Sequence, residues 1–194
     1  MPHIVDDTQM PVQERLRHTL GARAPQRLPC DVRAAVAVLL DRTSEPSLLF
    51  IRCAEHPADP WSGHVAFPGG KHDEGDRDLR ATAQRETREE IGLDLANADY
   101  LGQLDDLHTN ISAFVVSGFA YAVPTPPTPH LSEEVEDCFW VPLSHLTQPE
   151  RRTHLTFDGR EFPALSLGPH RPLLWGITYR FVEQVLGRLG RQQD

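Results

Sequence analysis

Apolar residues recur along the N-terminal part of the chain with two different periods. Residues 11–24 carry apolar side chains at steps of four from Val12 to Leu20, which predicts an amphipathic helix before the main body. The segments 33–40 and 47–51 are short and continuously apolar, and a polar turn separates them. This pattern is typical of two buried strands.

The centre of the chain combines a helix pattern with further strands. Residues 79–91 have helical spacing and stop at Gly92, a residue that favours the left-handed conformation at a helix C-terminus. The Pro-Gly-Gly sequence at 68–70 predicts a turn before this helix. The segments 100–107 and 112–123 predict two more strands.

The C-terminal third begins with a proline-rich stretch, 124–130, which we interpret as a surface loop inserted between strands. Residues 138–141 predict a strand, and Ser144 is positioned to cap a short helix. The Asp-Gly pair at 158–159 predicts a hairpin. An amphipathic pattern over 173–189 predicts the last helix.

Strands and helices interleave without a regular βαβ rhythm, which favours a mixed sheet in an α/β sandwich. A chain of 194 residues fits one ordinary domain with a short extension. We therefore expect a helical N-terminal extension over residues 1–28 and a single domain over residues 29–194.

Composition narrows the functional class. With 39% hydrophobic and 24% charged residues, the chain has the composition of a globular protein. Its formal net charge of −9 argues against nucleic-acid binding, and its longest apolar run is too short to cross a membrane. No signal peptide is visible, and three cysteines without a CxxC pair indicate neither a zinc site nor a disulfide framework. We expect a cytoplasmic protein without a membrane or nucleic-acid partner.

Three glutamates share one face of the helix predicted over residues 79–91. At 100° per residue, Glu86, Glu89 and Glu90 fall within an arc of about 100°, beside the apolar stripe. Only Glu89 has an arginine four residues away on this helix, Arg85, so a cation is needed to offset the repulsion. Oxygen ligands on one face suit a hard divalent ion, magnesium before zinc. The alternative is an ordinary solvated charged face.

The Gly-Gly turn just before this helix is the second indication of a site. Glycine lets the backbone approach a ligand closely, so Gly69 and Gly70 could offer a carbonyl to a metal or an amide to a phosphate. Between Asp73 and Asp94 the chain carries eight acids and four arginines, a net charge of −4. A pyrophosphate can approach such a segment only with metal ions that invert the local field.

The spacing of these residues resembles the Nudix box of the Nudix hydrolases, which implies a Nudix-like α/β/α sandwich with a mixed sheet. The matching residues are Gly70, Arg85, Glu86, Glu89, Glu90, Gly92 and Leu93. Three departures are present: Asp76 replaces the usual glutamate, one additional residue precedes Arg85, and Thr87 replaces an apolar residue.

A wider resemblance points to one group within this family. Residues 48–70 resemble the signature that precedes the box in coenzyme A pyrophosphatases, and residues 174–178 resemble a late segment of the same group. The signature usually has a basic residue midway and Gly-Gln before the FPGG sequence. Here these places hold His-Pro at 56–57 and Gly-His at 63–64.

The resemblance implies roles for individual residues. It assigns Glu86, Glu89 and Glu90 as metal ligands with the Gly69 carbonyl, and Arg85 as the residue that orients them. One carboxylate must accept the proton of the attacking water, and the resemblance implies that it is a glutamate of the box or an acid in a later loop. The candidates after the proline-rich loop are Glu133, Glu134 and Glu136, and we take Glu134 as the catalytic one.

The activity implied is hydrolysis of the pyrophosphate of a nucleoside diphosphate derivative, coenzyme A or its esters before others, with Mg²⁺ or Mn²⁺ as cofactor. We assign Gly69, Gly70 and Arg52 to substrate binding, with Arg52 on the 3′-phosphate. Two alternatives remain open: hydrolysis of another nucleotide (a dinucleotide, a nucleotide sugar or a nucleoside triphosphate), and a nucleotide-sensing module without catalysis. Homodimer formation also remains open.

Overall fold

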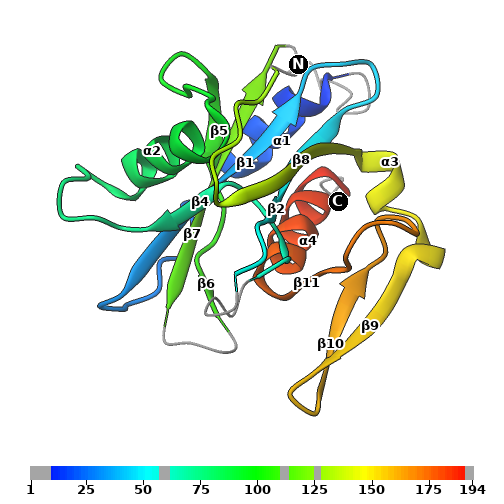
Figure 1. The fold of residues 1–194 in the computed structure, drawn as a ribbon. Coiled ribbons are helices and arrows are strands. Elements are labelled where there is room, and N and C mark those ends of the chain that lie inside the picture. Colours follow the sequence, from blue (N-terminus) through cyan, green and yellow to red (C-terminus); the bar gives the residue numbers. More distant parts are fainter. Residues whose placement is uncertain (1–9, 57–61, 110–113, 125–127, 191–194) are drawn as a thin grey trace.

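The computed structural model describes residues 10–56, 62–109, 114–124 and 128–190 (Figure 1). The helices are α1 (Val12–Gly21), α2 (Leu79–Ile91), α3 (Leu143–Leu146), the 3₁₀ helix η1 (Pro149–Arg151) and α4 (Gly176–Gly190). The strands are β1 (Arg33–Asp41), β2 (Ser47–Cys53), β3 (Val65–Ala66), β4 (Gly69–Lys71), β5 (Asp99–Gln103), β6 (Leu107–His108), β7 (Val115–Val123), β8 (Val135–Pro142), β9 (Arg152–Phe157), β10 (Arg160–Leu165) and β11 (Leu174–Trp175).

Within the described residues, eight strands form one mixed sheet. Its main order is β3-β2-β1-β7-β5, with β4 paired to β1, β6 to β7 and β8 to β2. β1 and β7 are parallel over nine residue pairs, and the other pairings are antiparallel. The mixed sheet confirms the fold class expected from the interleaved pattern.

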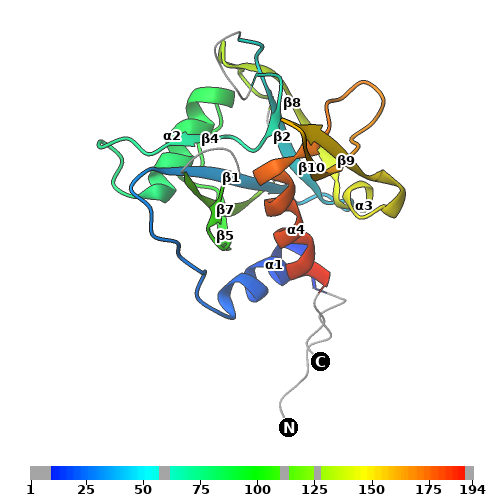
Figure 2. The ribbon, with the colours of Figure 1, turned by 90° about the horizontal axis from the view of Figure 1, so that it is seen from below.

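Alternation along β1 divides the core into two layers. Ala35, Ala37 and Leu39 face α2, whereas Val38 and Leu40 belong to the cluster that α1 and α4 cover. Figure 2 shows α2 on one side of the sheet, and α1 and α4 on the other. The molecule is therefore an α/β/α sandwich.

α1 contributes to this core although it precedes the sheet. Leu16 is fully buried and Leu20 is 4% exposed, and both belong to the α4-side cluster. Arg17 also donates to Asp99 at 2.6 Å and to the Tyr100 carbonyl at 2.8 Å. The described part of the predicted extension thus packs against the same sheet as the rest of the chain.

Several predicted elements are confirmed, and the confirmed ones depend on local signals. α2 has the predicted bounds, and β1 and β2 extend their predictions by one and two residues. The pair at 158–159 joins β9 and β10, and both residues have positive φ angles of 48° and 70°, as a type I′ turn requires. In Figure 1 this hairpin projects from the body of the molecule.

Four predictions about elements are wrong in their details, three before the last helix and one at its start. The turn at 68–70 continues as β4, because Gly69 to Lys71 pair with β1. The strand predicted over 100–107 is divided into β5 and β6, between which the buried Asp106 side chain accepts a hydrogen bond from Ser117 Oγ at 2.6 Å. Ser144 lies inside α3, whose N-cap is Pro142.

The last helix also begins later than its pattern indicates. Residues Leu174 and Trp175 form β11, which pairs with β10, and Gly176 then takes a φ of 64° at the start of α4. The strand predicted over 112–123 is described from Phe114 onward, and residues 112–113 lie outside the described part of the chain.

Candidate active site

The helix α2 has well-defined ends, which set the direction of its glutamates. Asp78 is the N-cap and accepts a hydrogen bond from Ala81 N at 2.8 Å, and Gly92 closes the helix in the left-handed conformation at φ 72°. Glu86, Glu89 and Glu90 all lie in the second half of this helix.

Glu90 is the most deeply buried of the three glutamates. Its side chain accepts a hydrogen bond from Gly69 N–H at 2.8 Å, and the residue is 9% exposed. Burial raises the pKa of Glu90 to about 8, against the opposing effect of the Gly69 hydrogen bond and with help from nearby Glu86 and Glu134. A solvated charged face, the alternative for this helix, is therefore wrong for Glu90.

Glu86 lies beside Gly70 of β4. Burial raises the pKa of Glu86, Arg85 lowers it, and the charges of Glu89 and Glu134 raise it further. A Cβ atom at Gly70 would clash with the Glu86 carboxylate. The glycine predicted for close backbone approach is thus the residue that leaves room for this carboxylate.

Arg85 connects three carboxylates. Its guanidinium contacts Glu89 at 2.8 Å and Glu86 at 2.9 Å, and its Nε and Nη2 each lie 3.0 Å from a different Asp76 oxygen. This bidentate bond is the largest cause that lowers the pKa of Asp76, to about 2. The i,i+4 pair with Glu89 is confirmed, whereas the expectation that Glu86 has no partner on its own helix is wrong.

Two backbone hydrogen bonds attach the segment that follows the proline-rich loop to the end of α2. His130 N donates to the Ile91 carbonyl and Ser132 N to the Glu90 carbonyl, both at 2.9 Å. This attachment brings Glu134 close enough to raise the pKa of both Glu86 and Glu90. Of the three candidate bases, Glu133 and Glu134 line the cavity described next, and Glu136 instead pairs with Arg52.

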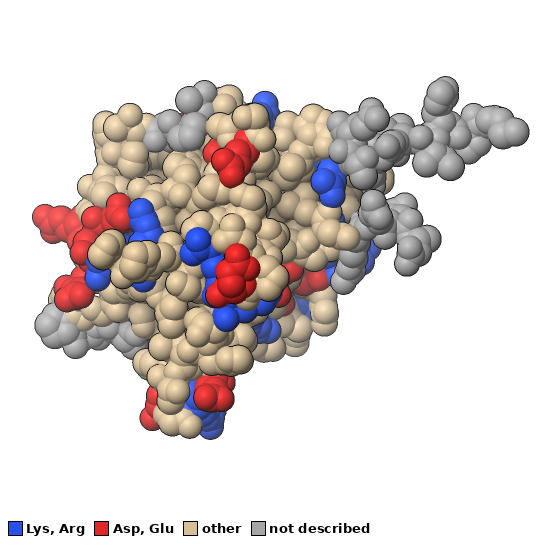
Figure 3. All heavy atoms as spheres, turned by 90° about the vertical axis from the view of Figure 1, so that its right-hand side faces the viewer, with Lys and Arg blue, Asp and Glu red and all other residues tan. Residues whose placement is uncertain are grey.

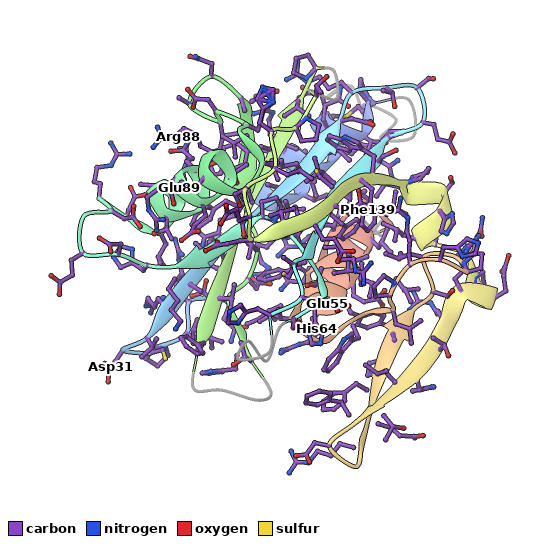
Figure 4. All side chains as sticks on the ribbon, viewed as in Figure 1. Asp31, Glu55, His64, Arg88, Glu89 and Phe139 are labelled. Atoms are coloured by element: carbon purple, nitrogen blue, oxygen red, sulfur yellow. The ribbon has the colours of Figure 1, made fainter. Side chains whose placement is uncertain are left out.

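A cavity of about 920 Å³ opens between these carboxylates and the first turn of α4, a volume typical of small-molecule sites. Figure 4 labels Glu89 on α2, and Glu55 and His64 between β2 and β3, three residues that border it. The carboxylate end also includes Gly69, Gly70 and Arg85. The far end is lined by aromatic and basic side chains: His64, Phe67, Lys71, Phe114, Trp175, Arg180 and Phe181.

Arg52 is not brought into this cavity. Its guanidinium lies 3.1 Å from Glu136 and 3.5 Å from Glu55, on the β2–β8 side. Its Nε is buried and has no hydrogen-bond partner among the described residues. This position of Arg52 does not support its role on the 3′-phosphate. Its side chain is directed to Glu136 on β8 and to Glu55 in the loop that follows β2.

The cationic residues at the far end were missed by sequence reasoning. Lys71 is the single lysine of the chain and follows the Gly-Gly pair directly, a signal that could have found it. Arg180 lies in an ordinary amphipathic helix, and no local feature distinguishes it from the other arginines of that segment.

The chemistry of the ligand atoms in this site suits a hard divalent cation. Glu86, Glu89 and Glu90 offer carboxylate oxygens, and the buried Glu90 carboxyl forms no ion pair with a basic side chain among the described residues. In the described ranges, no group of three or more His, Cys, Asp or Glu residues is already positioned to hold an ion. Glu90 is bonded to Gly69 and Glu89 to Arg85, so both would leave these partners to coordinate one.

Comparison with known proteins identifies the family. The sequence model of the NUDIX domain matches residues 31–162, which include the whole carboxylate end of the site. The chain belongs to the NUDIX domain family. It is a Nudix pyrophosphohydrolase, and divalent metal ions are the general cofactors of Nudix hydrolases.

Two curated relatives are coenzyme A diphosphatases by name. The chain is 35% identical over 174 residues to human "Mitochondrial coenzyme A diphosphatase NUDT8", covering 86% of this chain and 72% of the relative. The mouse protein of the same name is 34% identical over 185 residues, covering 90% and 86%. The resemblance to this group within the Nudix family is confirmed.

A solved structure supports the fold. The MutT/nudix family protein from Enterococcus faecalis superposes with a TM-score of 0.61 at 16% identity, covering 87% of this chain and 66% of that one. At this identity the likeness extends to the fold alone.

Proposed function

We propose that this protein hydrolyses the pyrophosphate bond of a nucleoside diphosphate derivative with the help of a divalent metal ion, and that coenzyme A or its esters are preferred. The observation that carries the proposal is a group of three carboxylates, the buried Glu90, the half-buried Glu86 and the exposed Glu134, at one end of a cavity of about 920 Å³. The names of the human and mouse relatives support the choice of coenzyme A.

The carboxylates of α2 hold the metal in this proposal. Glu86, Glu89 and Glu90 supply the ligands, with the Gly69 carbonyl as a further one, and Mg²⁺ or Mn²⁺ is the ion that suits them. When bound, such an ion neutralises phosphate charge and makes a water more acidic. Arg85 orients Glu86 and Glu89 through its contacts at 2.9 and 2.8 Å.

Glu134 accepts the proton of the attacking water. It lines the cavity, and among the described residues its carboxylate takes part in no ion pair, so its oxygens remain available. The backbone bonds of His130 and Ser132 to α2 hold its segment beside the metal ligands. Gly69 and Gly70 border the same space, and their backbone groups are available to a phosphate there.

A panel of pyrophosphates tests the proposal. The purified protein is incubated with magnesium and coenzyme A, a dinucleotide, a nucleotide sugar or a nucleoside triphosphate, and the products are separated and identified by chromatography. We expect coenzyme A to give 4′-phosphopantetheine and adenosine 3′,5′-bisphosphate. Preference for another member would overturn the coenzyme A assignment, and no cleavage of any member would favour a sensing module.

The binding partners and the cellular location of this protein are also proposals. No helix in the described part of the chain is long and apolar enough to cross a membrane. We keep the cytoplasmic location as a prediction, although the human relative is named as mitochondrial. Homodimer formation is tested by measuring the mass of the protein in solution.

A further inference from the structure

Two cationic side chains line the cavity at a distance from the carboxylates of α2. Lys71 Nζ lies 5.2 Å from the centroid of the Phe114 ring, and Arg180 Nη1 donates to the His108 carbonyl. Arg85, the other cation of the lining, is bound by three acids. Within the described ranges, neither Lys71 nor Arg180 forms an ion pair with a carboxylate.

The sheet register places both cations on the α4 side. Lys71 pairs with Ala34, and Ala34 pairs in turn with Val116 of β7. Directly paired residues project to the same face of a sheet, and Val116 packs in the cluster that contains Phe181 of α4. Lys71 therefore faces α4, the helix that carries Arg180.

The next residue toward the N-terminus of β4 faces the opposite way. Gly70 projects toward Glu86 of α2, because successive residues of a strand alternate between faces. The cavity consequently passes around the short strand β4, from acids on one face of the sheet to cations on the other. The lining also includes the apolar residues Val36, Phe114 and Ile177.

Cations without a carboxylate partner in the lining of a cavity suit an anionic ligand. Lys71 is exposed and Arg180 is half-buried, so a ligand in the cavity can reach both side chains. The chain has a net charge of −9, so long-range attraction cannot bring an anion to this point. An ammonium and a guanidinium that line the same cavity are the usual protein partners of a phosphate. The pyrophosphate belongs at the carboxylate end, and these cations therefore suit a second anionic group of the same molecule.

We propose that Lys71 and Arg180 bind a phosphate monoester that the substrate carries apart from its pyrophosphate, and that they select nucleoside diphosphate derivatives with such a group. The inference rests on the proposed function and specifies its substrate class. It assigns to these two residues the role that the sequence suggested for Arg52.

The test compares coenzyme A with 3′-dephospho-coenzyme A, which lacks this phosphate, in the full-length protein with magnesium. In Lys71→Gln and Arg180→Gln we expect kcat/KM to fall about ten- to a hundredfold more for coenzyme A than for the dephospho form, mainly through KM. Lys71→Arg and Arg180→Lys retain the charge and should restore most of the preference. Arg160→Gln, on the exposed β10 hairpin, is the matched control and should change neither substrate.

The outcomes separate this inference from the proposed function. Equal losses on both substrates in the neutral variants, with thermal unfolding unchanged, would overturn the inference alone. A preference that disappears in Arg52→Gln and persists in the Lys71 and Arg180 variants would also overturn it. A wild-type protein that cleaves neither substrate would overturn the coenzyme A proposal, and this inference with it.

Discussion

Arg85 shows how one residue organises the charges of the site. It lies on α2 next to Glu89, on the side of the glutamates away from the apolar stripe. Asp76, in the loop before the helix, contacts it at two distances of 3.0 Å. The same guanidinium then contacts Glu86 and Glu89. Asp76 therefore sets the position of Arg85, although it departs from the glutamate usual at this place.

Asp76→Asn should destabilise the protein at neutral pH, because Arg85 loses its bidentate partner. Arg85 holds the pKa of Asp76 at about 2, below the 3.8 of an unfolded chain. With screening by solvent, we expect about 1–2 kcal/mol of unfolding free energy at pH 7. Since the folded pKa is the lower one, this contribution is complete above about pH 5 and is lost as pH falls toward about 2.

Denaturant unfolding at several pH values measures the Asp76 effect. The difference between wild type and Asp76→Asn should shrink steadily in acid. Glu74→Gln, at an exposed position of the same loop, is the control and should leave stability unchanged. A difference that stays constant from pH 7 to pH 2 would contradict the argument.

Glu90→Gln and Glu86→Gln should each lower turnover roughly 100-fold or more, because a neutral amide replaces an anionic metal ligand of similar volume. Without metal, the melting temperature should hold or rise, since Glu90 is buried beside Glu86 and Glu134. Steady-state kinetics and thermal unfolding measure both effects. Glu161→Gln, on the exposed hairpin, is the control, and a drop of many degrees in Glu90→Gln would mark this acid as structural.

At the scale of elements, short segments that pair with the sheet place the chemistry. β4 has three residues, yet its pairing with β1 sets Gly70 against Glu86 and directs the Gly69 N–H to Glu90. α1 has a different role, because its two buried leucines close the α4 side of the core.

Gly70→Ala tests the close approach of β4 to α2. The added Cβ would clash with the end of the Glu86 side chain. This side chain can adopt another rotamer at little cost in stability, but its carboxylate would then no longer point into the site. We expect a roughly 100-fold loss of kcat with a small change in melting temperature. Gly187→Ala, where an added Cβ meets nothing, should leave kcat unchanged and stabilise α4 by about 0.5–1 kcal/mol.

Leu16→Ala tests whether α1 belongs to the folded unit. Leu16 is fully buried, so its truncation should cost about 2–5 kcal/mol of unfolding free energy. Leu131→Ala, at a residue that is 41% exposed, is the control and should cost far less. Equal stabilities of the two variants in denaturant would show that residues 1–28 form an independent extension.

At the scale of the whole molecule, negative charge is concentrated where the substrate must bind. The segment from Asp73 to Asp94 carries a net charge of −4, close to half of the −9 of the chain. On the face in Figure 3, basic and acidic side chains instead lie in small mixed patches between neutral areas. The proposed metal ion would offset the negative charge of this segment.

Metal removal should abolish activity. Excess chelator should stop hydrolysis, Mg²⁺ or Mn²⁺ should restore it, and Ca²⁺ should restore it poorly because its looser coordination suits in-line transfer less well. Binding to the folded state should also raise the melting temperature in proportion to the logarithm of metal concentration. Kinetics and thermal unfolding with each ion measure this, and full activity in excess chelator would contradict the metal hypothesis.

Local sequence signals were sufficient to predict the features that depend on neighbouring residues. The bounds of α2, the arc of its glutamates and the turn at 158–159 follow from helical periodicity and from turn and capping residues within a few positions. The Nudix assignment rests on the same local spacing. These predictions succeeded because each physical cause acts within one or two turns of the chain.

Contacts between residues that are far apart in the sequence depend on the tertiary structure. β4 forms a strand because its residues pair with β1. Arg52 forms ion pairs with Glu136 and Glu55 and is not among the residues that line the cavity. Lys71 and Arg180 are more than 100 positions apart in the sequence, and only the pairing of β4, β1 and β7 beneath α4 brings them to one cavity. Such contacts depend on packing between elements, which the local pattern of the chain does not contain.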